Sequence, residues 1–262
     1  MRKTILDILK LKELKEKISV LTCYTSNYAK ILDNHSDILL VGDSLGMVLY
    51  GFDSTLPVTL DMMINHGKAV VKSSKNSLVV VDMPFATYQE SPEQAYRNAA
   101  KILQETNCSA VKLEGGFEMA ETIKFLTERG VPVMAHIGLK PQYFNQYGGY
   151  FVQGKDKKSE DAIIKDINAI NNSGAFSVVL EGVKKNIADK ICKISKNPVI
   201  GIGASENCDG QVLVTEDMLG FFDESAKFVK KYSNIKDVIS NAAKKYSSEV
   251  KSQKFPTKEY LY

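Results

Sequence analysis

Short apolar runs alternate along the chain with longer segments of helical period. The runs LLV, LVVV, VPVM, VVL and PVIGI are nearly continuous, whereas a strand with one solvated face would alternate apolar and polar residues. Continuous short runs are typical of strands buried on both faces, as in a parallel sheet covered by helices. The predicted strands are Ile18–Tyr24, Asp37–Val41, Leu78–Val81, Ala110–Leu113, Val131–Ala135, Ser177–Leu180, Pro198–Ile202 and a weaker one at Val212–Val214.

Helices are predicted between these runs and after the last of them. The third has a clear start, because Ser91 can cap it, Pro92 suits the first helical position and Gln94 completes a capping-box pattern. The predicted helices are Ser26–Asn34, Leu60–Ser73, Pro92–Glu105, Phe117–Arg129, Glu160–Asn172, Lys185–Ser195 and Ile235–Lys251.

This order of elements favours an α/β fold with a closed (β/α)8 TIM barrel over an open doubly wound sheet. No GxGxxG follows the first strand and no P-loop occurs, so these motifs give no support for nucleotide binding. No linker or low-complexity stretch interrupts the chain. We therefore predict a single barrel domain over residues 1–262, with an N-terminal helix and a C-terminal helical extension.

Composition and charge limit the kinds of partner that the protein is expected to bind. The chain has 262 residues, and its 34 basic and 31 acidic residues give a net charge of +3, which is too balanced to indicate nucleic-acid binding. The first residues, MRKTILDILKLKELKEK, carry a charge every few positions and do not resemble a signal peptide. No segment approaches the roughly 20 apolar residues of a membrane helix. The four scattered cysteines are expected to be reduced thiols of a cytoplasmic protein that binds no membrane.

Most of the apolar runs end in a charged residue. Because the active site of such a barrel lies at the C-terminal ends of its strands, these side chains are expected to meet there. Carboxylates that meet in a partly buried site repel one another, and a divalent cation is the simplest way to stabilise them. Oxygen ligands without a Cys/His cluster favour Mg²⁺. The charged residues are Asp43 in LLVGDS, Asp82 in VVVDMP, Glu114 in VKLEGG, His136 in PVMAHIG and Glu181 in VVLEG.

Lys112 adds a positive charge to this set. Lys112 and Glu114 are two positions apart on one strand and share a face, while Val111 and Leu113 point to the other face. If the apolar pair packs on the helices, the charged pair faces the barrel interior. A lysine there could bind a substrate carboxylate or balance acidic metal ligands.

Each candidate also has a purely structural interpretation. A lone Asp43 or Asp82 after a strand is more often a helix cap or turn former than a ligand. Lys112 and Glu114 could form an internal salt bridge, and His136 could be a hydrogen-bonded core residue. It is the joint occurrence at equivalent strand ends that favours a functional site.

Several longer segments resemble the motifs of the ketopantoate hydroxymethyltransferase family. They are VGDSLGMVLYGFDSTLPVTLDMM, VVVDMPF, SPEQAYRNAAKIL, AVKLEGG, VPVMAHIGLKPQ, GGYFVQGK, SVVLEGV, PVIGIGA and CDGQVLV, and they occur in the family's order. The resemblance implies a (β/α)8 barrel that assembles into a homo-oligomer, often a decamer. It also implies transfer of a one-carbon unit from 5,10-methylenetetrahydrofolate to 3-methyl-2-oxobutanoate in pantothenate biosynthesis, through an enolate stabilised by Mg²⁺.

The resemblance also implies roles for individual residues. Asp43, Asp82 and Glu114 match the magnesium-site residues, and Asp43 and Asp82 thereby also contact the bound oxo acid. Ser44 and Lys112 match groups that bind the oxo acid directly. Glu181 matches the proton acceptor, and His136 matches a motif histidine with a supporting role.

This sequence departs from the family pattern at a few positions, none of which is a proposed metal or base residue. Thr25 stands where Asp is common, Phe52 where the family often has His, and Ser205 where Gly is usual. Lys184 and Ala226 replace common prolines. These changes are expected to affect folate contacts and oligomer packing rather than the reaction.

Two other hypotheses remain open at this level. One is a related barrel enzyme that acts on phosphoenolpyruvate or cleaves a carbon–carbon bond of a 2-oxo or 2-hydroxy acid, against which the DSTLPVT and GGYFVQG segments argue. The other is a non-catalytic barrel retained for binding, against which the intact set of charged residues argues.

Overall fold

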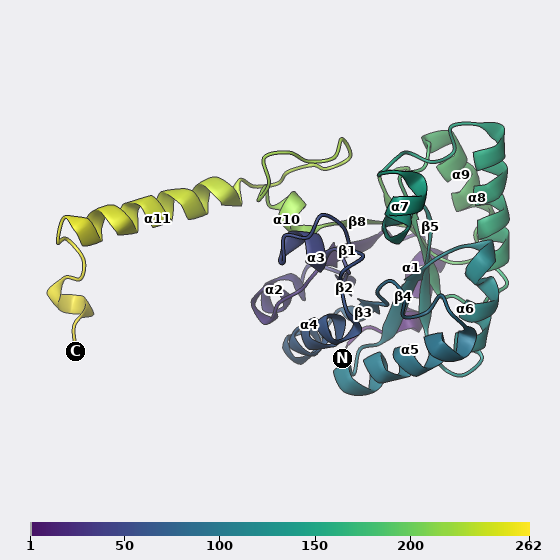
Figure 1. Ribbon diagram of the computed structural model, residues 1–262, viewed down its shortest axis with the longest axis horizontal. Coiled ribbons are helices and arrows are strands. Elements are labelled where there is room, and N and C mark those ends of the chain that lie inside the picture. Colours follow the sequence, from purple (N-terminus) through teal and green to yellow (C-terminus); the bar gives the residue numbers. More distant parts are fainter. Residues whose placement is uncertain (1) are drawn as a thin grey trace. The chain divides into compact units, whose positions relative to one another are not determined.

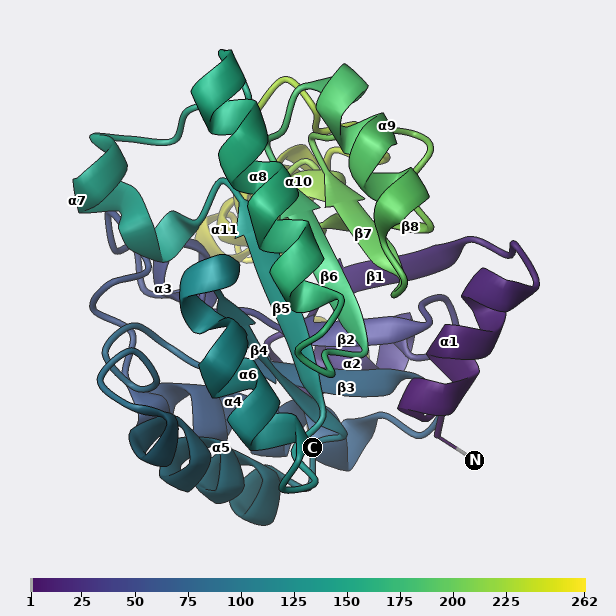
Figure 2. The same ribbon diagram turned by 90° about the vertical axis from the view of Figure 1, so that its right-hand side faces the viewer.

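The protein is described by a computed structural model over residues 2–262, and it divides into two compact units. The first ends at Leu213 and the second is Val214–Tyr262. The first unit is a closed barrel of eight parallel strands in the order β1 to β8, so the predicted TIM barrel is confirmed (Figures 1 and 2). The strands are β1 Ile18–Thr22, β2 Ile38–Val41, β3 Leu78–Asp82, β4 Ala110–Glu114, β5 Val133–Gly138, β6 Ser177–Glu181, β7 Val199–Ile202 and β8 Gly210–Leu213.

The strand bounds differ from prediction mainly at the ends that carry the charged residues. Strands β3, β4 and β6 extend one residue further than predicted, so Asp82, Glu114 and Glu181 are the last residues of their strands. His136 was predicted at the end of its strand, which is wrong. It lies inside β5, because Ile137 and Gly138 continue the pairing with β6.

Helices surround the barrel (Figure 2). At α5, Ser91 Oγ accepts a hydrogen bond from the Gln94 N–H as predicted, whereas the Gln94 side chain accepts from the Glu90 N–H, one residue before the cap. The helix predicted from Phe117 begins with a 3-10 turn, η1 Phe117–Met119. The α-helices of this unit are α1 Ile5–Glu13, α2 Ser26–Leu32, α3 Leu45–Val48, α4 Leu60–Ser73, α5 Pro92–Thr106, α6 Ala120–Thr127, α7 Phe144–Tyr147, α8 Lys157–Ile170 and α9 Lys185–Ile194.

Two hydrophobic cores explain the continuous apolar runs. One lies between strands and helices, and Val111 and Leu113 of β4 belong to it. The other lies inside the barrel and includes Ala110 of β4 and Ile8 of α1. Side chains alternate between the two faces of a strand, and each face is buried in one of the two cores. Both faces are therefore apolar, which gives a continuous apolar run in the sequence. Lys112 lies on the same face of β4 as Ala110, which is the predicted orientation toward the barrel interior.

Strands β7 and β8 are joined without a helix. Residues 203–209 suffice because β8 begins beside β7, with Gly210 paired to Ile200. Ser205, one of the departures from the family pattern, is buried in this connection and donates a hydrogen bond to Asp189 Oδ1 of α9. The serine therefore tethers the connection to the neighbouring helix.

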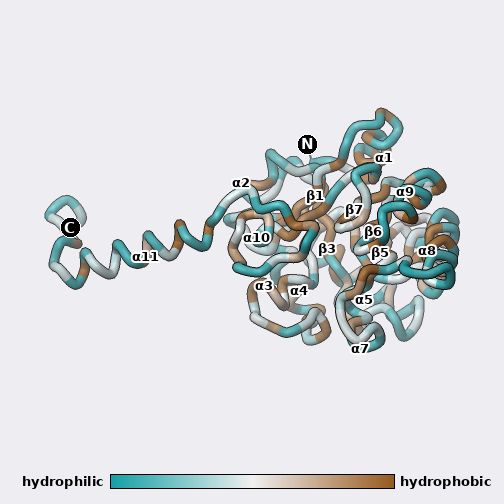
Figure 3. Tube along the Cα trace, turned by 90° about the horizontal axis from the view of Figure 1, so that it is seen from above, coloured by the Kyte–Doolittle hydropathy of each residue, from teal (hydrophilic) through white to brown (hydrophobic). Residues whose placement is uncertain are grey.

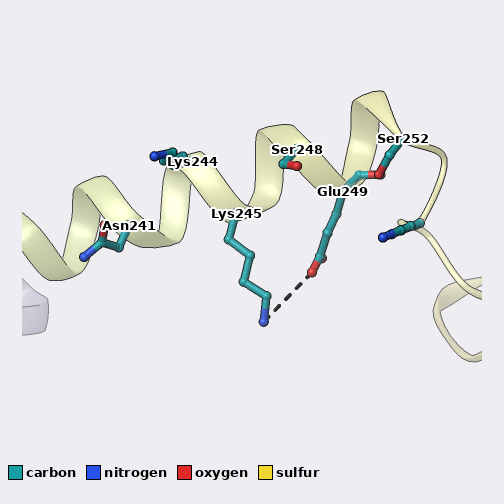
Figure 4. A pocket seen from close by; sticks show the side chains of 7 residues that line it. Asn241, Lys244, Lys245, Ser248, Glu249 and Ser252 are labelled. Carbon is teal, nitrogen blue, oxygen red and sulfur yellow. Dashed lines mark hydrogen bonds and ion pairs between the residues drawn. The ribbon is translucent and has the colours of Figure 1, made fainter.

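The second unit contains α10 Thr215–Met218, α11 Ile235–Lys251 and the 3-10 turn η3 Lys258–Tyr260. Hydrophilic and hydrophobic residues alternate along α11 (Figure 3), and none of its residues is buried. Figure 4 shows a shallow, polar groove on this helix, where Lys245 Nζ lies 3.9 Å from Glu249 Oε1. Within residues 2–262, no helix is long and apolar enough to cross a membrane.

Helix α1 supplies a direct test of the barrel interior. Ile8 is 0% exposed, whereas Leu6, on the same helix, is 70% exposed. We predict that Ile8→Ala lowers the free energy of unfolding by about 2–5 kcal/mol, because it leaves a cavity in the inner core. The matched change Leu6→Ala is expected to stay within about 0.5 kcal/mol of the parent. Urea unfolding measures both, and similar losses for the two variants would contradict the assignment of Ile8 to the core.

Candidate active site

The residues predicted from strand ends come together at the C-terminal end of the barrel. Register brings them side by side: Asp82 is paired with Lys112, Glu114 with His136, and Gly138 with Glu181. Asp43 lies two residues after Val41, the last residue of β2. All the charged members are buried except Glu181, whose side chain is 17% exposed. The charged groups are therefore shielded from bulk solvent on the barrel side, and the site reaches solvent near Glu181.

An ion pair between Lys112 and Asp82 lies at the centre of the site. Lys112 Nζ donates to Asp82 Oδ1 at 2.9 Å, while Asp82 Oδ2 accepts from the Asp43 N–H at 3.1 Å. Burial alone would lower the pKa of Lys112, but the charges of Asp82, Asp43 and Glu114 raise it above its ordinary value. Lys112 is thus a permanent cation. Its salt bridge is made across strands to Asp82, not along β4 to Glu114.

Asp43 is held in a site that disfavours its negative charge. Burial, and secondly the charge of Asp82, raise the pKa of Asp43 to about 7. A hydrogen bond of 2.8 Å from Gln142 Nε2 to Asp43 Oδ2 favours the charged form and lowers this pKa in part. One lysine therefore does not balance the acidic groups gathered here.

Glu114 is almost inaccessible to solvent. Its Oε2 accepts a hydrogen bond of 3.0 Å from the Gln142 N–H, and its Oε1 lies 3.8 Å from His136 Nδ1. Burial first, and then the charge of Asp43, raise the pKa of Glu114 well above its ordinary value. Glu114 therefore favours its protonated form unless a cation binds nearby.

His136 is buried between Glu114 and Glu181. Its Nε2 lies 3.3 Å from Glu181 Oε2, but the geometry is not that of a hydrogen bond, and neither ring nitrogen has a hydrogen-bond partner among residues 2–262. Burial lowers the pKa of His136, so the ring is neutral. Buried polar groups are normally paired, so both nitrogens of this ring are open to a further hydrogen-bond partner.

Ser44 joins the site through its hydroxyl. Ser44 Oγ and Tyr24 Oη are 2.8 Å apart, and Tyr24 is buried. A Cβ at Gly42 would lie only 2.8 Å from Ser44 Oγ, so only glycine permits this close approach. The glycine of the VGDS segment is thus explained by the position of the serine.

Two buried residues of the site, Gln142 and Tyr88, escaped the sequence analysis. Besides its bond to Asp43, Gln142 Nε2 donates to the Met83 carbonyl at 3.0 Å. Its Oε1 accepts from Tyr88 Oη at 2.6 Å, and Tyr88 Oη accepts from the Glu114 N–H at 3.1 Å. Gln142 thus connects Asp43 to Glu114. A neutral amide in a turn lacks the signal that a charge at a strand end gives, although Gln142 closes the VPVMAHIGLKPQ segment.

Two departures from the family pattern have structural roles nearby. Thr25 caps α2 by accepting a hydrogen bond from the Tyr28 N–H. The Phe52 ring stacks on Tyr50 with 5.6 Å between centroids, and Tyr50 Oη lies 3.0 Å from His66 Nε2. Neither residue belongs to the charged cluster.

The side chains that could bind a metal ion can be compared with the predicted magnesium site. Within residues 2–262, no three His, Cys, Asp or Glu side chains are arranged as a group that could hold a metal ion by themselves. Asp43 and Asp82 are nevertheless adjacent, and Mg²⁺ commonly takes one or two carboxylates and fills its remaining positions with water or substrate. The pair fits such an ion, because a cation would relieve the repulsion that raises the pKa of Asp43. Metal binding by all three predicted acids stays a prediction.

Sequence comparison gives one consistent result. The sequence pattern of the family described as ketopantoate hydroxymethyltransferase matches residues 2–258. A protein of Paramagnetospirillum magneticum, named 3-methyl-2-oxobutanoate hydroxymethyltransferase, is 56% identical over 248 residues, which cover 94% of this chain and 90% of the relative. A protein of the same name from Bartonella henselae is 53% identical and covers 95% of this chain and 90% of its own length.

Solved structures show the same fold at low identity. A phosphoenolpyruvate phosphomutase from Streptomyces platensis subsp. rosaceus aligns with a TM-score of 0.63 at 10% identity, covering 96% of this chain and 88% of its own. A phosphonopyruvate hydrolase, in complex with oxalate and Mg²⁺, aligns with a TM-score of 0.63 at 10% identity, covering 99% and 92%. At such identity these likenesses show the barrel architecture alone.

Gln142 gives a test of how the site is held together. We predict that Gln142→Ala lowers the free energy of unfolding by about 1–3 kcal/mol, because Asp43, Tyr88 and the Met83 carbonyl lose their buried partner. Gln146→Ala, at an exposed position of the neighbouring helix α7, is the matched control and should change stability little. Thermal unfolding compares them. Equal effects would show that the buried amide does not support the cluster.

Proposed function

This chain belongs to the ketopantoate hydroxymethyltransferase family, and we propose that it transfers a one-carbon unit from 5,10-methylenetetrahydrofolate to 3-methyl-2-oxobutanoate. The product would be 2-dehydropantoate, also called ketopantoate, in the biosynthesis of pantothenate and coenzyme A. The name shared by relatives more than 50% identical supports the acceptor and the group transferred. The same identity favours this activity over carbon–carbon cleavage and over a non-catalytic barrel.

The observation that carries the proposal is one buried lysine among several carboxylates. Lys112, held as a cation by Asp82, would attract the carboxylate of the oxo acid into the site. Ser44, with its hydroxyl fixed by Tyr24, would donate a hydrogen bond to the same substrate. These contacts orient an anionic, planar oxo acid with its C3 atom toward Glu181.

Magnesium is the proposed metal, held by Asp43 and Asp82 with Glu114 beside them. When bound, Mg²⁺ would act as a Lewis acid on the oxygen atoms of the oxo acid and stabilise negative charge that develops there. The excess of acidic groups over Lys112 supports this assignment. A barrel relative of the same fold was solved with oxalate and Mg²⁺.

Glu181 is the proposed base. It would take the proton from C3 of the oxo acid, and the electron pair left behind would spread onto the adjacent ketone as an enolate. The His136 ring lies beside this carboxylate, with Nε2 3.3 Å from Glu181 Oε2, and would limit its movement by contact. Because Glu181 is the partly exposed member of the site, it can exchange its proton with solvent.

The enolate carbon would then form a bond to the methylene carbon of the folate, while the bond from that carbon to one of the two folate nitrogens breaks. Water subsequently replaces the folate nitrogen at that carbon and supplies the hydroxyl group of the product. The proton from C3 and one proton of water end on the two folate nitrogens. One water molecule is consumed, and tetrahydrofolate leaves.

We predict that Glu181→Gln slows exchange of the C3 hydrogen of 3-methyl-2-oxobutanoate with D₂O by at least about a hundredfold, a typical contribution of a general base. The assay needs Mg²⁺ but no folate, and NMR follows it. Binding of the oxo acid, measured by calorimetry, should persist in the variant. Unchanged exchange would remove Glu181 from this role, and absent exchange in the parent would remove the enolate mechanism.

We also propose that copies of this chain associate through α11. Val238, Tyr246 and Val250 are exposed and spaced by multiples of four, which places them on one side of the helix. An apolar stripe of this kind is typical of a helix that packs against a partner. A second copy is the occupant that the family resemblance implies, and further association of such pairs would give the larger, decameric form.

The α11 stripe predicts a change of oligomeric state on mutation. The double variant Val238→Lys and Val250→Lys should dissociate the assembly, because two charges cannot be desolvated in an apolar contact. Ser248→Lys, on the polar groove of Figure 4, is the control and should leave the assembly intact. Light scattering after size exclusion measures the mass. A monomeric parent would contradict the proposal.

A further inference from the structure

A cavity of about 320 Å³ opens beside the charged cluster, and none of the roles assigned above uses it. Gln142 is the wall that the cavity shares with the cluster, since its Nε2 also lies 2.8 Å from Asp43 Oδ2. A molecule in the cavity would therefore be separated from the oxo-acid site by one side chain. The cavity is lined by Leu56, Phe85, Gln89, Gln142, Tyr143, Asn145 and Gln146.

The apolar walls of this cavity suit a flat ring. Phe85 is 44% exposed, although large aromatic side chains are usually buried in a core. Tyr143 is fixed in place, because Lys140 Nζ lies 3.9 Å from its ring centroid and Tyr147 stacks on it at 5.9 Å. Lys140 is in turn paired with Glu118. An aromatic wall that is already ordered loses little entropy when a ring stacks against it.

The remaining walls carry carboxamides. Gln89 Nε2 donates to Gln142 Oε1 at 3.2 Å, which fixes the orientation of that amide. Asn145 and Gln146 are exposed, and their side chains make no hydrogen bond to another residue among 2–262. The carboxamides of Asn145 and Gln146 each offer a donor and an acceptor side by side, which matches a ring whose edge alternates ring nitrogen, N–H and carbonyl.

The charge of the lining residues restricts the class of ligand further. None of the lining residues is charged, so the cavity does not favour a phosphate or a carboxylate. A neutral, fused heteroaromatic ring with an amide-like edge satisfies the aromatic walls and the carboxamides together. The pterin of a folate is such a ring.

We propose that this cavity binds the pterin ring of the folate co-substrate, an inference that rests on the proposed function. Gln142 then lies between the pterin in the cavity and the oxo acid beside Asp43. The glutamate tail of the folate points to solvent, because no cation in the lining would hold it.

Removing the aromatic wall tests the assignment. Phe85→Ala is expected to raise the KM for 5,10-methylenetetrahydrofolate at least about tenfold more than the KM for the oxo acid, since ring stacking is lost. Asn145→Ala, a change at an exposed position that leaves folding intact, should also raise the folate KM selectively. Phe117→Ala is the matched control, because Phe117 is a surface aromatic, 54% exposed, that does not line the cavity.

A second measurement separates this inference from the proposed function. Calorimetry with 6-methyltetrahydropterin, which lacks the tail, reports on the cavity without any turnover. Loss of pterin binding in Phe85→Ala but not in Phe117→Ala would support the assignment. If the parent makes ketopantoate while both cavity variants keep the parent's folate KM, the cavity assignment is overturned and the function stands. If the parent shows neither C3 exchange nor product, the proposed function fails. Calorimetry with the pterin then still tests whether the cavity binds this ring.

Discussion

The buried ion pair between Lys112 and Asp82 is the interaction on which the site depends. Two charges removed from water are stable only when their geometry is good and their remaining groups are hydrogen-bonded. Here the Asp43 N–H satisfies the second oxygen of Asp82, and parallel register holds β3 and β4 at the required separation. The barrel therefore fixes the positions of the charges, and the opposite charges of Lys112 and Asp82 stabilise each other.

Because side chains alternate along the strands, the barrel interior is divided into an apolar layer and a charged layer. On β4, Ala110 belongs to the inner core, while Lys112 and Glu114 lie on the same face nearer the C-terminal end. The barrel interior therefore changes from apolar to charged along one strand. Val111 and Leu113 pack outward in the core between strands and helices, which directs Lys112 and Glu114 to the barrel interior.

The fold and the charged residues could be predicted because their signals are local. Continuous apolar runs identify buried strands, and an acid at the end of such a run needs no distant information. Gln142 and Tyr88 could not be predicted in this way, since Gln142 bonds to Asp43, 99 positions away, and Tyr88 to Gln142, 54 positions away. The location of His136 inside β5 depended on pairing with β6, which the hydrophobic pattern does not specify.

Closure of the barrel has a consequence for how the chain folds as it is synthesised. Ile18 at the start of β1 pairs with Gly210 at the start of β8. The edge of β1 that faces β8 therefore stays unpaired until almost the whole unit has been synthesised. Contacts between residues so distant in sequence form slowly, and an uncovered strand edge invites pairing with other chains. A nascent chain that stops short of β8 is consequently an aggregation hazard, whatever the quality of its first seven strands.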